Sequence, residues 1–264
     1  MPEGDTIWRA ARALQAALGG RTVTGFKSSL PAVAAAARRL GLVGRPVATV
    51  EARGKHLLVR FEGGAVLHTH QGMTGSWHLY RRGSRWRQAP HLARVVLEAG
   101  ETVAVCFRAP QVELLRAAEA DRHRILVRLG PDVMAGGFDA AEARVRLRAA
   151  GDEEIGAALL DQSRLAGIGN VYKSEVLFLC GVDPSAAVSG LADDTLDRII
   201  ATARVEMRRN LDSAVRTTRG GARGGHWVYR RAGQPCLRCG ATIERRRQGH
   251  PPRSTYSCPA CQKP

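Results

Sequence analysis

Residues 159–173 read LLDQSRLAGIGNVYK and carry the strongest signal of the helical part of the chain. An apolar helix is expected to end in a turn that contains Gly167 and Gly169, and a second helix to begin at Asn170, a favoured N-cap residue. Glycines let the backbone turn tightly and approach a ligand closely. The amides and positive dipole end of the second helix would form an anion site that holds one phosphate. An ordinary corner between two helices remains the alternative for this segment alone.

The charge of the chain points to a polyanionic partner. Its 264 residues include 40 Lys and Arg against 24 Asp and Glu, which gives a formal net charge of +16. Such an excess predicts binding to nucleic acid with a strong dependence on salt. A generally basic protein without such a partner is the alternative. Only four of the 40 basic residues are lysines, namely Lys27, Lys55, Lys173 and Lys263.

Length and hydropathy limit where the protein works and how it is organised. The chain is long enough for one large domain or for two to three smaller ones. No run of about 18 apolar residues exists, so we expect no membrane span. The N-terminus has no apolar signal core, so we expect a cytoplasmic protein. We also expect it to associate with the nucleoid and to act as a monomer.

Four of the six cysteines have the spacing of a zinc site. The pairs Cys236-x2-Cys239 and Cys258-x2-Cys261 are separated by a short segment, as in zinc ribbons, where each pair lies on a tight turn and supplies two thiolates. A disulfide interpretation is poor for a cytoplasmic chain. Four thiolates leave no open position for water, so the one Zn²⁺ is expected to be structural. Cys106 and Cys180 are expected to be small buried side chains.

Hydrophobic periodicity divides the chain into three parts, and the fold class is multi-domain α+β. A helix is expected over residues 5–18, capped by Asp5 or Thr6 and ended by Gly19-Gly20. Short strand-like runs follow up to about residue 115 and predict an antiparallel β-sandwich. The runs include Val47–Val50, Leu57–Phe61, Ala65–Leu67, Val95–Leu97 and Thr102–Phe107. Helical segments are expected near residues 139–150, 153–161, 170–180 and 191–211, then a mobile basic linker over 216–225. The predicted domains are 1–120 (sandwich with flanking helix), 121–225 (helical, with the linker) and 226–264 (zinc-finger β-hairpin).

The first residues carry a possible nucleophile. The chain opens Met1-Pro2-Glu3, and removal of Met1 would leave a secondary amine at Pro2 with a carboxylate beside it. Such an amine can form an iminium with an aldehyde-level carbon, and the carboxylate can move protons. A simple chain start before a helix is the alternative for these residues alone.

Five motifs in one order resemble a known family over essentially the whole chain. They are Pro2-Glu3-Gly4, Gly54-Lys55-His56, His70-Gln71-Gly72-Met73, the Gly167-Ile168-Gly169-Asn170 turn and the terminal four-cysteine finger. This set resembles the formamidopyrimidine-DNA glycosylase and endonuclease VIII family, and in particular the endonuclease VIII branch of actinobacterial type. The resemblance implies a helix–two-turns–helix domain in the middle of the chain and damaged DNA as partner, whether duplex, single-stranded or bubble.

The resemblance also implies catalytic roles. Pro2 would attack the sugar carbon of the damaged nucleotide, Glu3 would protonate the sugar ring oxygen, and Lys55 would hold a phosphate and assist protonation. Arg253 would grip the phosphates that flank the flipped nucleotide. An exposed turn lysine and one more surface arginine are the alternatives for Lys55 and Arg253.

DNA contacts are implied for a second set of residues, in which Met73 would fill the space left by the extruded base. The set comprises His70, Met73, Arg108, Asn170, Lys173, Glu175 and Arg253. A core methionine is the alternative for Met73, and a surface partner of Lys173 is the alternative for Glu175.

Three departures separate this chain from the purine-directed branch of the family. The stretch after Arg108 has no aromatic residue, Gly156 occupies the position of a lysine, and the linker to Cys236 is short for a loop that caps oxidised purines. We therefore expect a bifunctional DNA glycosylase and AP lyase, acting by β,δ-elimination in base excision repair on oxidised pyrimidines. A purine-directed glycosylase for 8-oxoguanine and formamidopyrimidines is the first alternative, and a non-catalytic zinc-ribbon nucleic-acid-binding protein is the second.

Overall fold

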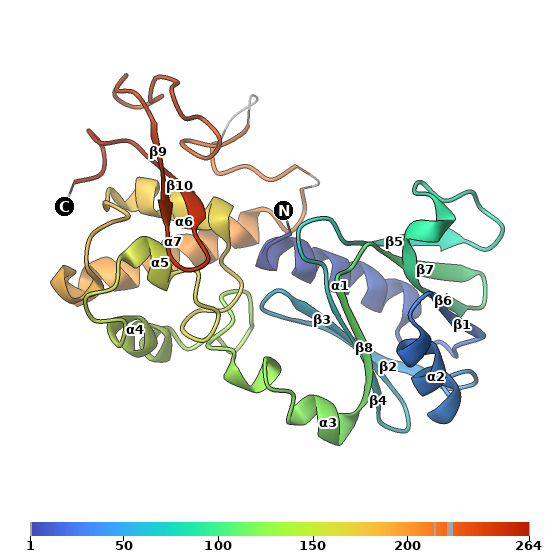
Figure 1. Ribbon diagram of the computed structural model, residues 1–264. Coiled ribbons are helices and arrows are strands. Elements are labelled where there is room, and N and C mark those ends of the chain that lie inside the picture. Colours follow the sequence, from blue (N-terminus) through green and yellow to red (C-terminus); the bar gives the residue numbers. More distant parts are fainter. Residues whose placement is uncertain (1, 214, 221–223, 264) are drawn as a thin grey trace. The chain divides into compact units, whose positions relative to one another are not determined.

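The computed structural model describes residues 2–213, 215–220 and 224–263 and divides into two compact units (Figure 1). The first unit runs to Val127 and the second begins at Arg128. The helical segment and the zinc-finger segment, expected as separate domains, thus lie in one unit. Within the described residues, no helix is both long enough and apolar enough to cross a membrane.

The first unit contains two four-stranded antiparallel sheets. One has the strand order β2-β3-β4-β8 and the other β1-β6-β7-β5. The bounds of the first sheet's strands are, in that order, Val47–Arg53, His56–Phe61, Ala65–His70 and Gln111–Arg116. Those of the second are Gly25–Ser28, Ala93–Ala99, Thr102–Phe107 and Ser76–Arg81. The five strand segments expected from the sequence all lie inside these strands, and the expected sandwich is confirmed.

Alternation of side chains explains why the two sheets enclose one core. Along β6, every second residue from Ala93 to Ala99 is buried, because successive side chains of a strand point to opposite faces. Leu57, Leu67, Leu97 and Cys106 contribute to this core from both sheets. Cys106 is therefore a buried small side chain, as expected, whereas Cys180 in the second unit is only half-buried.

Helix α1 (Gly4–Leu18) packs into the same core. Its apolar stripe consists of Ile7, Ala11, Leu14 and Leu18, which are at most 4% exposed. Gly19 follows the helix, as expected. The expected cap is wrong, because the N-cap is Glu3 without a side-chain cap bond, and Asp5 and Thr6 lie inside the first turn.

The first unit also contains helices in regions where the sequence did not predict them. Helix α2 (Pro31–Arg39) lies in a region expected to form only strands, and it begins with a proline at its first turn, where the missing N–H costs nothing. Val33, Ala36 and Ala37 bury its apolar face in the sandwich core. The short helix α3 (Ala117–Asp121) follows β8, and the 3₁₀ turn Pro90–Leu92 precedes β6.

The second unit is built around two helices that pack on each other, α6 (Asn170–Cys180) and α7 (Asp193–Arg209). Helix α4 (Ala140–Arg148) packs on α7, and α5 (Ile155–Ala158) is a single turn before α6. All four helices lie within the segments expected from the sequence, although α5 is much shorter than its segment. The expected N-cap is wrong by one residue, because Gly169 takes that position and Asn170 is the first residue of α6.

The zinc-finger hairpin packs directly on α6. Strands β9 (Glu244–Gln248) and β10 (Arg253–Ser257) pair antiparallel, and β10 contacts α6 (Figure 1). The predicted linker is described only in part, because residues 221–223 lie outside the described residues. Its described ends are held together: the amide groups of Thr218 and Arg219 donate to the carbonyl of Gly225.

Candidate functional site

The start of the chain is held in place by α1. The carbonyl of Glu3 accepts hydrogen bonds from the amides of Thr6 (2.9 Å) and Ile7 (3.1 Å), and Glu3 is fully buried. Pro2 precedes this anchored residue and is half-buried. The residue that would carry the terminal amine after loss of Met1 is therefore one peptide away from a packed helix.

Lys55 lies where the sequence predicted, in the turn between β2 and β3. Gly54, the other turn residue, has a φ of 58°, a left-handed conformation that favours glycine. Lys55 is half-buried and lies close enough to His70 for its ammonium to influence that ring. Lys55 and His70 are thus brought together in the first unit.

His70 ends β4 and is arranged as a neutral hydrogen-bond donor. Burial, followed by the charges of Lys55 and His68, lowers the pKa of His70, so the ring is neutral near pH 7. Its Nδ1 accepts the amide hydrogen of Gly72 at 3.3 Å. In a neutral imidazole the proton then lies on Nε2, which is free to donate to an oxygen of a ligand.

Met73 and Arg108 lie on two loops that pack against each other. A Cβ on Gly72 would approach the Pro110 ring at 2.7 Å, and one on Gly75 would approach Ala109 Cα at 3.0 Å. Met73 is 67% exposed, so the alternative of a core methionine is wrong. Arg108 has a φ of 53°, unusual for a residue with a side chain. Its amide donates to the carbonyl of Leu92, and its side chain is exposed.

In the second unit, Gln162 shapes the turn before α6. Its Nε2 donates to the carbonyls of Leu160 (2.9 Å) and Ile168 (3.0 Å), and its Oε1 accepts the amide of Gly167 (3.0 Å). Gly167 has a φ of 103°. The sequence pattern assigned no role to Gln162. A glutamine five residues before a glycine turn is the only signal that could have suggested one.

Asn170 and Arg253 are brought together by a hydrogen bond across 84 residues. Asn170 Nδ2 donates to the carbonyl of Ser254 at 2.5 Å, and Arg253, the preceding residue, is exposed at the start of β10. Asn170 Oδ1 is buried and has no partner among the described residues. The two residues expected to hold phosphates therefore lie on one anchored surface of the second unit.

Lys173 is not available to DNA, and that part of the prediction is wrong. Its side chain is fully buried, and Nζ donates to Thr255 Oγ1 at 2.6 Å. Nζ also lies 3.5 Å from the carbonyl of Ser254. Lys173 therefore joins α6 to β10 through hydrogen bonds inside the protein.

Glu175 organises the segment between the helices and the zinc finger. It is fully buried, and its two oxygens accept the backbone amides of Trp227 (2.7 Å), Val228 (2.8 Å) and Tyr229 (2.8 Å). Thr218 Oγ1 donates to the same carboxylate. The alternative of a surface pair with Lys173 is wrong, because both side chains are buried. Direct contact of Glu175 with DNA stays a prediction.

The four zinc-finger cysteines converge as predicted. Their sulfur atoms all lie within 4.8 Å of one another, with Cys236 Sγ 3.9 Å from Cys261 Sγ and Cys239 Sγ 3.4 Å from Cys258 Sγ. Burial opposes ionisation of Cys236, but the backbone amides of Arg238 and Cys239 outweigh it and lower the pKa of this thiol to about 7. Four converging sulfurs are the donor set that structural zinc requires, and they hold one Zn²⁺.

Arg238, inside the first cysteine pair, ties the zinc site to the helices. Its guanidinium lies 4.5 Å from the ring centre of Phe178 on α6 and 5.6 Å from that of Trp227. Its amide donates to Cys236 Sγ at 3.4 Å. Arg238 therefore connects the zinc site to α6 by direct packing.

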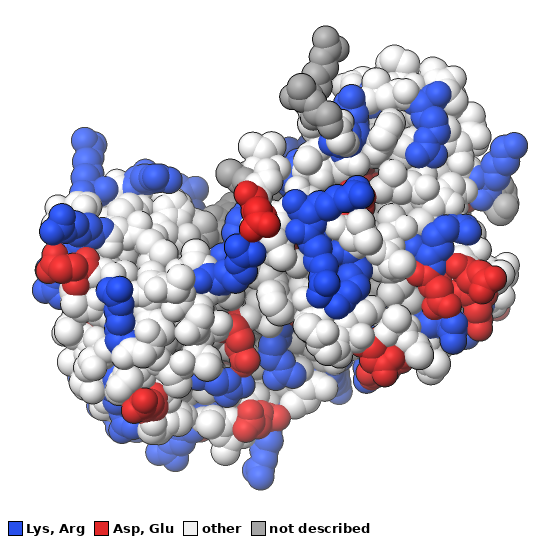
Figure 2. Space-filling model, turned by 180° about the vertical axis from the view of Figure 1, so that it is seen from behind, with Lys and Arg blue, Asp and Glu red and all other residues white. Residues whose placement is uncertain are grey.

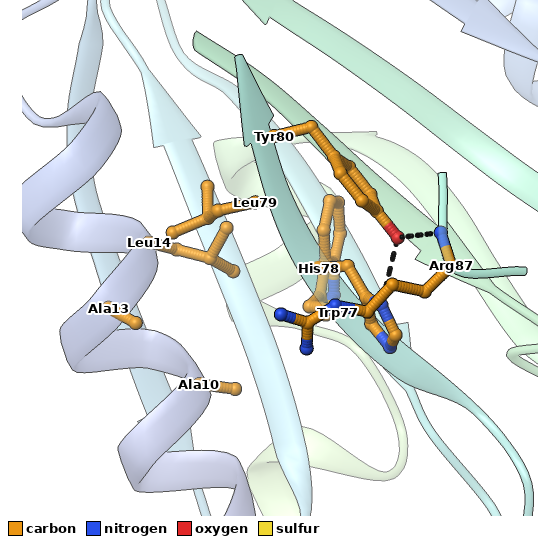
Figure 3. A pocket seen from close by; sticks show the side chains of 8 residues that line it. All are labelled: Ala10, Ala13, Leu14, Trp77, His78, Leu79, Tyr80 and Arg87. Carbon is orange, nitrogen blue, oxygen red and sulfur yellow. Dashed lines mark hydrogen bonds between the residues drawn. The ribbon is translucent and has the colours of Figure 1, made fainter. Parts of the chain in front are cut away.

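A separate hollow of about 300 Å³ lies between α1 and the edge strand β5 (Figure 3). Tyr80 Oη accepts the amide of Arg87 at 3.0 Å and lies 3.0 Å from His78 Nδ1. None of the residues predicted to act on DNA lines this hollow.

The surface in Figure 2 carries many more Lys and Arg side chains than Asp and Glu side chains, in agreement with the net charge of +16.

Three models of known protein families match successive parts of the chain. Residues 1–112 match the formamidopyrimidine-DNA glycosylase N-terminal domain, and residues 129–222 match the formamidopyrimidine-DNA glycosylase H2TH domain. Residues 233–264 match the zinc finger found in FPG and IleRS.

Full-length relatives and solved structures agree with these matches. The chain is 42% identical to endonuclease 8 2 of Mycobacterium tuberculosis, over 100% of both chains. It is 40% identical to the DNA-(apurinic or apyrimidinic site) lyase Nei2 of Mycolicibacterium smegmatis over 99% of both, and 32% identical to endonuclease 8 of Escherichia coli over 99% of this chain and 100% of the other. The fold is similar to that of Lactococcus lactis Fpg in complex with abasic-site DNA, with a TM-score of 0.83, 21% identity and coverage of 99% and 100%.

Replacement of Glu175 tests its structural role. Glu175→Gln keeps the size of the side chain but places an amide donor against backbone amides, so we expect the second unit to lose about 2 to 4 kcal/mol of unfolding free energy. Urea unfolding measures this loss. Glu142→Gln, which removes an exposed i,i+4 pair with Arg146, is the matched control and should cost less than about 0.5 kcal/mol. Equal losses in the two variants would show that the buried carboxylate does not hold this segment.

Proposed function

This chain belongs to the formamidopyrimidine-DNA glycosylase family, and we propose that it is a bifunctional DNA glycosylase and AP lyase that removes oxidised pyrimidines. The observation that carries this proposal is the anchored N-terminus, where half-buried Pro2 adjoins fully buried Glu3 at the head of α1. The names of the relatives, endonuclease 8 and AP lyase, agree with it. Damaged DNA is the substrate, as in the solved complexes of similar fold.

Pro2 supplies the nucleophile in this proposal. After removal of Met1 its ring nitrogen attacks the sugar C1′ of the damaged nucleotide, and the oxidised base leaves. A secondary amine bonded to an aldehyde-level carbon forms a cationic iminium. This cation makes the neighbouring C2′ hydrogen acidic, so a base, for which the Glu3 carboxylate is the nearest candidate, removes that proton as the 3′ phosphate leaves. A second elimination of the same kind then expels the 5′ phosphate.

Glu3 and Lys55 assist this chemistry. The carboxyl group of Glu3 is one residue from the amine and supplies a proton to the sugar ring oxygen as the ring opens. Lys55, at the β2–β3 turn, places an ammonium beside a phosphate of the lesion strand. An ammonium can exchange protons and a guanidinium cannot, which explains a lysine in a chain with 36 arginines among its 40 basic residues.

The remaining predicted contacts have two roles: some hold the DNA strand in position, and others fill the space left by the extruded base. His70 Nε2 and exposed Arg253 donate to phosphate oxygens and position the strand without reading its sequence. One hydrogen of Asn170 Nδ2 is bonded to the Ser254 carbonyl, so the other hydrogen of that amide is the donor to phosphate. Met73, 67% exposed on its loop, is an unbranched side chain that can enter the space of an extruded base. Arg108, exposed on the loop packed against that of Met73, contacts DNA beside it.

Two features favour pyrimidines over purines: there is no space for a side chain at Gly156, and there is no aromatic side chain in the loop after Arg108. Gly156 is buried, and a Cβ there would lie 2.5 Å from Gln248 Oε1 and 2.9 Å from the carbonyl of Pro184. A lysine, which the purine-directed branch has at this position, could not be accommodated without movement of the backbone. The loop after Arg108 continues with buried Ala109 and exposed Pro110, so it offers no aromatic side chain to fill a purine-sized gap.

Two further properties follow from the same proposal. A site with few groups that enclose the base should accept lesions outside a matched duplex, including single-stranded and bubble DNA. A net charge of +16 supports association with chromosomal DNA between encounters, because release of counterions favours non-specific binding.

Blocking the terminal amine tests the mechanism. A chain with an uncleaved N-terminal tag should lose base excision and borohydride trapping on abasic DNA by at least about 1,000-fold, because no free amine remains at Pro2. Its affinity for the same DNA should change little. The matched control carries the same tag at the C-terminus. Normal trapping by the N-terminally tagged chain would exclude Pro2 as the nucleophile, and trapping by neither chain would favour a non-catalytic DNA-binding protein.

Comparison of lesions tests the branch. In single-turnover excision on duplexes that differ only in the lesion, thymine glycol and 5-hydroxycytosine should be removed at least about tenfold faster than 8-oxoguanine opposite cytosine. Thymine glycol is non-planar and already poorly stacked, so its extrusion costs less of the unstacking energy of a few kcal/mol. Equal or faster excision of 8-oxoguanine would favour the purine-directed alternative and leave the Pro2 chemistry intact.

A further inference from the structure

A group of polar side chains lies on the outer face of the sheet β2-β3-β4-β8. His68 on β4 is paired in register with Glu113 on β8, so both side chains point to the same face, and His123 follows the short helix α3. His68 is fully buried and His123 and Glu113 are half-buried. None of the three has a role in the reaction proposed above.

The three side chains converge on one point. Glu113 Oε2 lies 2.9 Å from His68 Nδ1 and 3.1 Å from His123 Nε2. One ligand atom from each of the three residues lies within 4.8 Å of the others. Nitrogen and oxygen ligands about 2.0 to 2.2 Å from a tetrahedral ion are spaced by about 3.4 Å. The two observed distances are a few tenths of an ångström shorter, so a small outward movement of the Glu113 carboxylate would open a coordination shell.

One carboxylate oxygen carries both rings when no metal ion is bound. The rings of His68 and His123 then both donate to Oε2 of Glu113. A metal ion would take the place of these two protons and bind the same three atoms, Nδ1 of His68, Oε2 of Glu113 and Nε2 of His123. The other nitrogen of His123, Nδ1, is buried with no hydrogen-bond partner among the described residues in either case.

We propose that His68, Glu113 and His123 form a second metal site, which binds a divalent transition ion such as Zn²⁺ or Co²⁺ through two imidazoles and one carboxylate. Two nitrogen donors exclude Mg²⁺ and Ca²⁺, which require oxygen ligands. Three protein ligands leave at least one position for water. The ion would join β4, β8 and the segment after α3, all in the first unit.

Metal binding at this site would reverse a hydrogen bond to the next histidine. His56 Nδ1 lies 2.9 Å from His68 Nε2, and while His68 Nδ1–H donates to Glu113, His68 Nε2 must accept from His56 Nδ1–H. Coordination through His68 Nδ1 moves the His68 proton to Nε2, which then donates to His56 Nδ1, and the His56 proton moves to its Nε2. No proton is gained or lost by this pair. His56 faces His70 across the β3–β4 pairing, so the tautomer change ends beside the edge that carries Lys55.

The test uses the full chain with zinc already bound at the four cysteines. Titration with Co²⁺, followed by calorimetry, should show one additional site, whose affinity falls at least about tenfold in Glu113→Gln and in His123→Gln. His78→Gln, which removes a histidine from the other sheet, is the matched control and should bind Co²⁺ like the natural chain. Nitrogen NMR of the histidine rings, recorded with diamagnetic Zn²⁺ in place of Co²⁺, should show the His56 proton move from Nδ1 to Nε2 when the ion binds.

Two outcomes would overturn the proposal. One is the absence of an additional site in the natural chain, and the other is an additional site of unchanged affinity in both variants. His123 is near the surface, so His123→Gln keeps the test decisive if the Glu113 variant unfolds, which its thermal midpoint reports. These readouts need no DNA, so failure of the glycosylase proposal would not affect them.

Discussion

The burial of α1 is the constraint on which the proposed chemistry depends. The first residues of a chain are usually poorly ordered unless other contacts hold them. Here Ile7, Leu14 and Leu18 are each 1% exposed within the sandwich core, and the helix they anchor begins directly after Glu3. The carbonyl of Glu3 takes part in the first helical hydrogen bonds, so Pro2 keeps little freedom. A terminal amine can act as an accurately placed nucleophile only because an apolar face farther along the helix is packed.

The second unit has an apolar core of its own and adds buried polar side chains that join its helices to the zinc hairpin. One helix, α6, buries Asn170, Lys173 and Glu175, and each of these finds its partners in the linker or in the zinc hairpin. Breaking one member of such a group leaves a buried donor or charge without a partner, which costs more than the bond itself contributes. The four cysteines that hold the zinc ion lie before β9 and after β10, so the ion fixes the ends of the hairpin that are away from its turn. Arg238, between two of these cysteines, packs on the ring of Phe178. Exposed Arg253 is thereby presented from a rigid strand.

Local patterns predicted what depends on local physics. The alternation in β6, the zinc spacing and the turn with Gly167 were all readable, because period, ligand spacing and glycine conformation are properties of short segments. Helix α2 was missed although its alanines and its leading Pro31 favour a helix, because the whole region up to residue 115 was assigned to strands from its Gly and Pro punctuation. The fate of Lys173 could not be predicted, because its partner Thr255 is 82 residues away and only the folded hairpin brings them together. The same holds for Glu175 and the amide of Trp227, which are 52 residues apart.

If the nitrogen of Pro2 is the nucleophile, it carries the sugar in the covalent complex with abasic-site DNA. The protein should be reduced with borohydride while bound to abasic-site DNA, digested, and analysed by mass spectrometry of the peptides. We expect the sugar remnant on an N-terminal peptide that begins at Pro2, with the mass added to its nitrogen. An adduct on Lys55 or another lysine, with an unmodified N-terminal peptide, would contradict it.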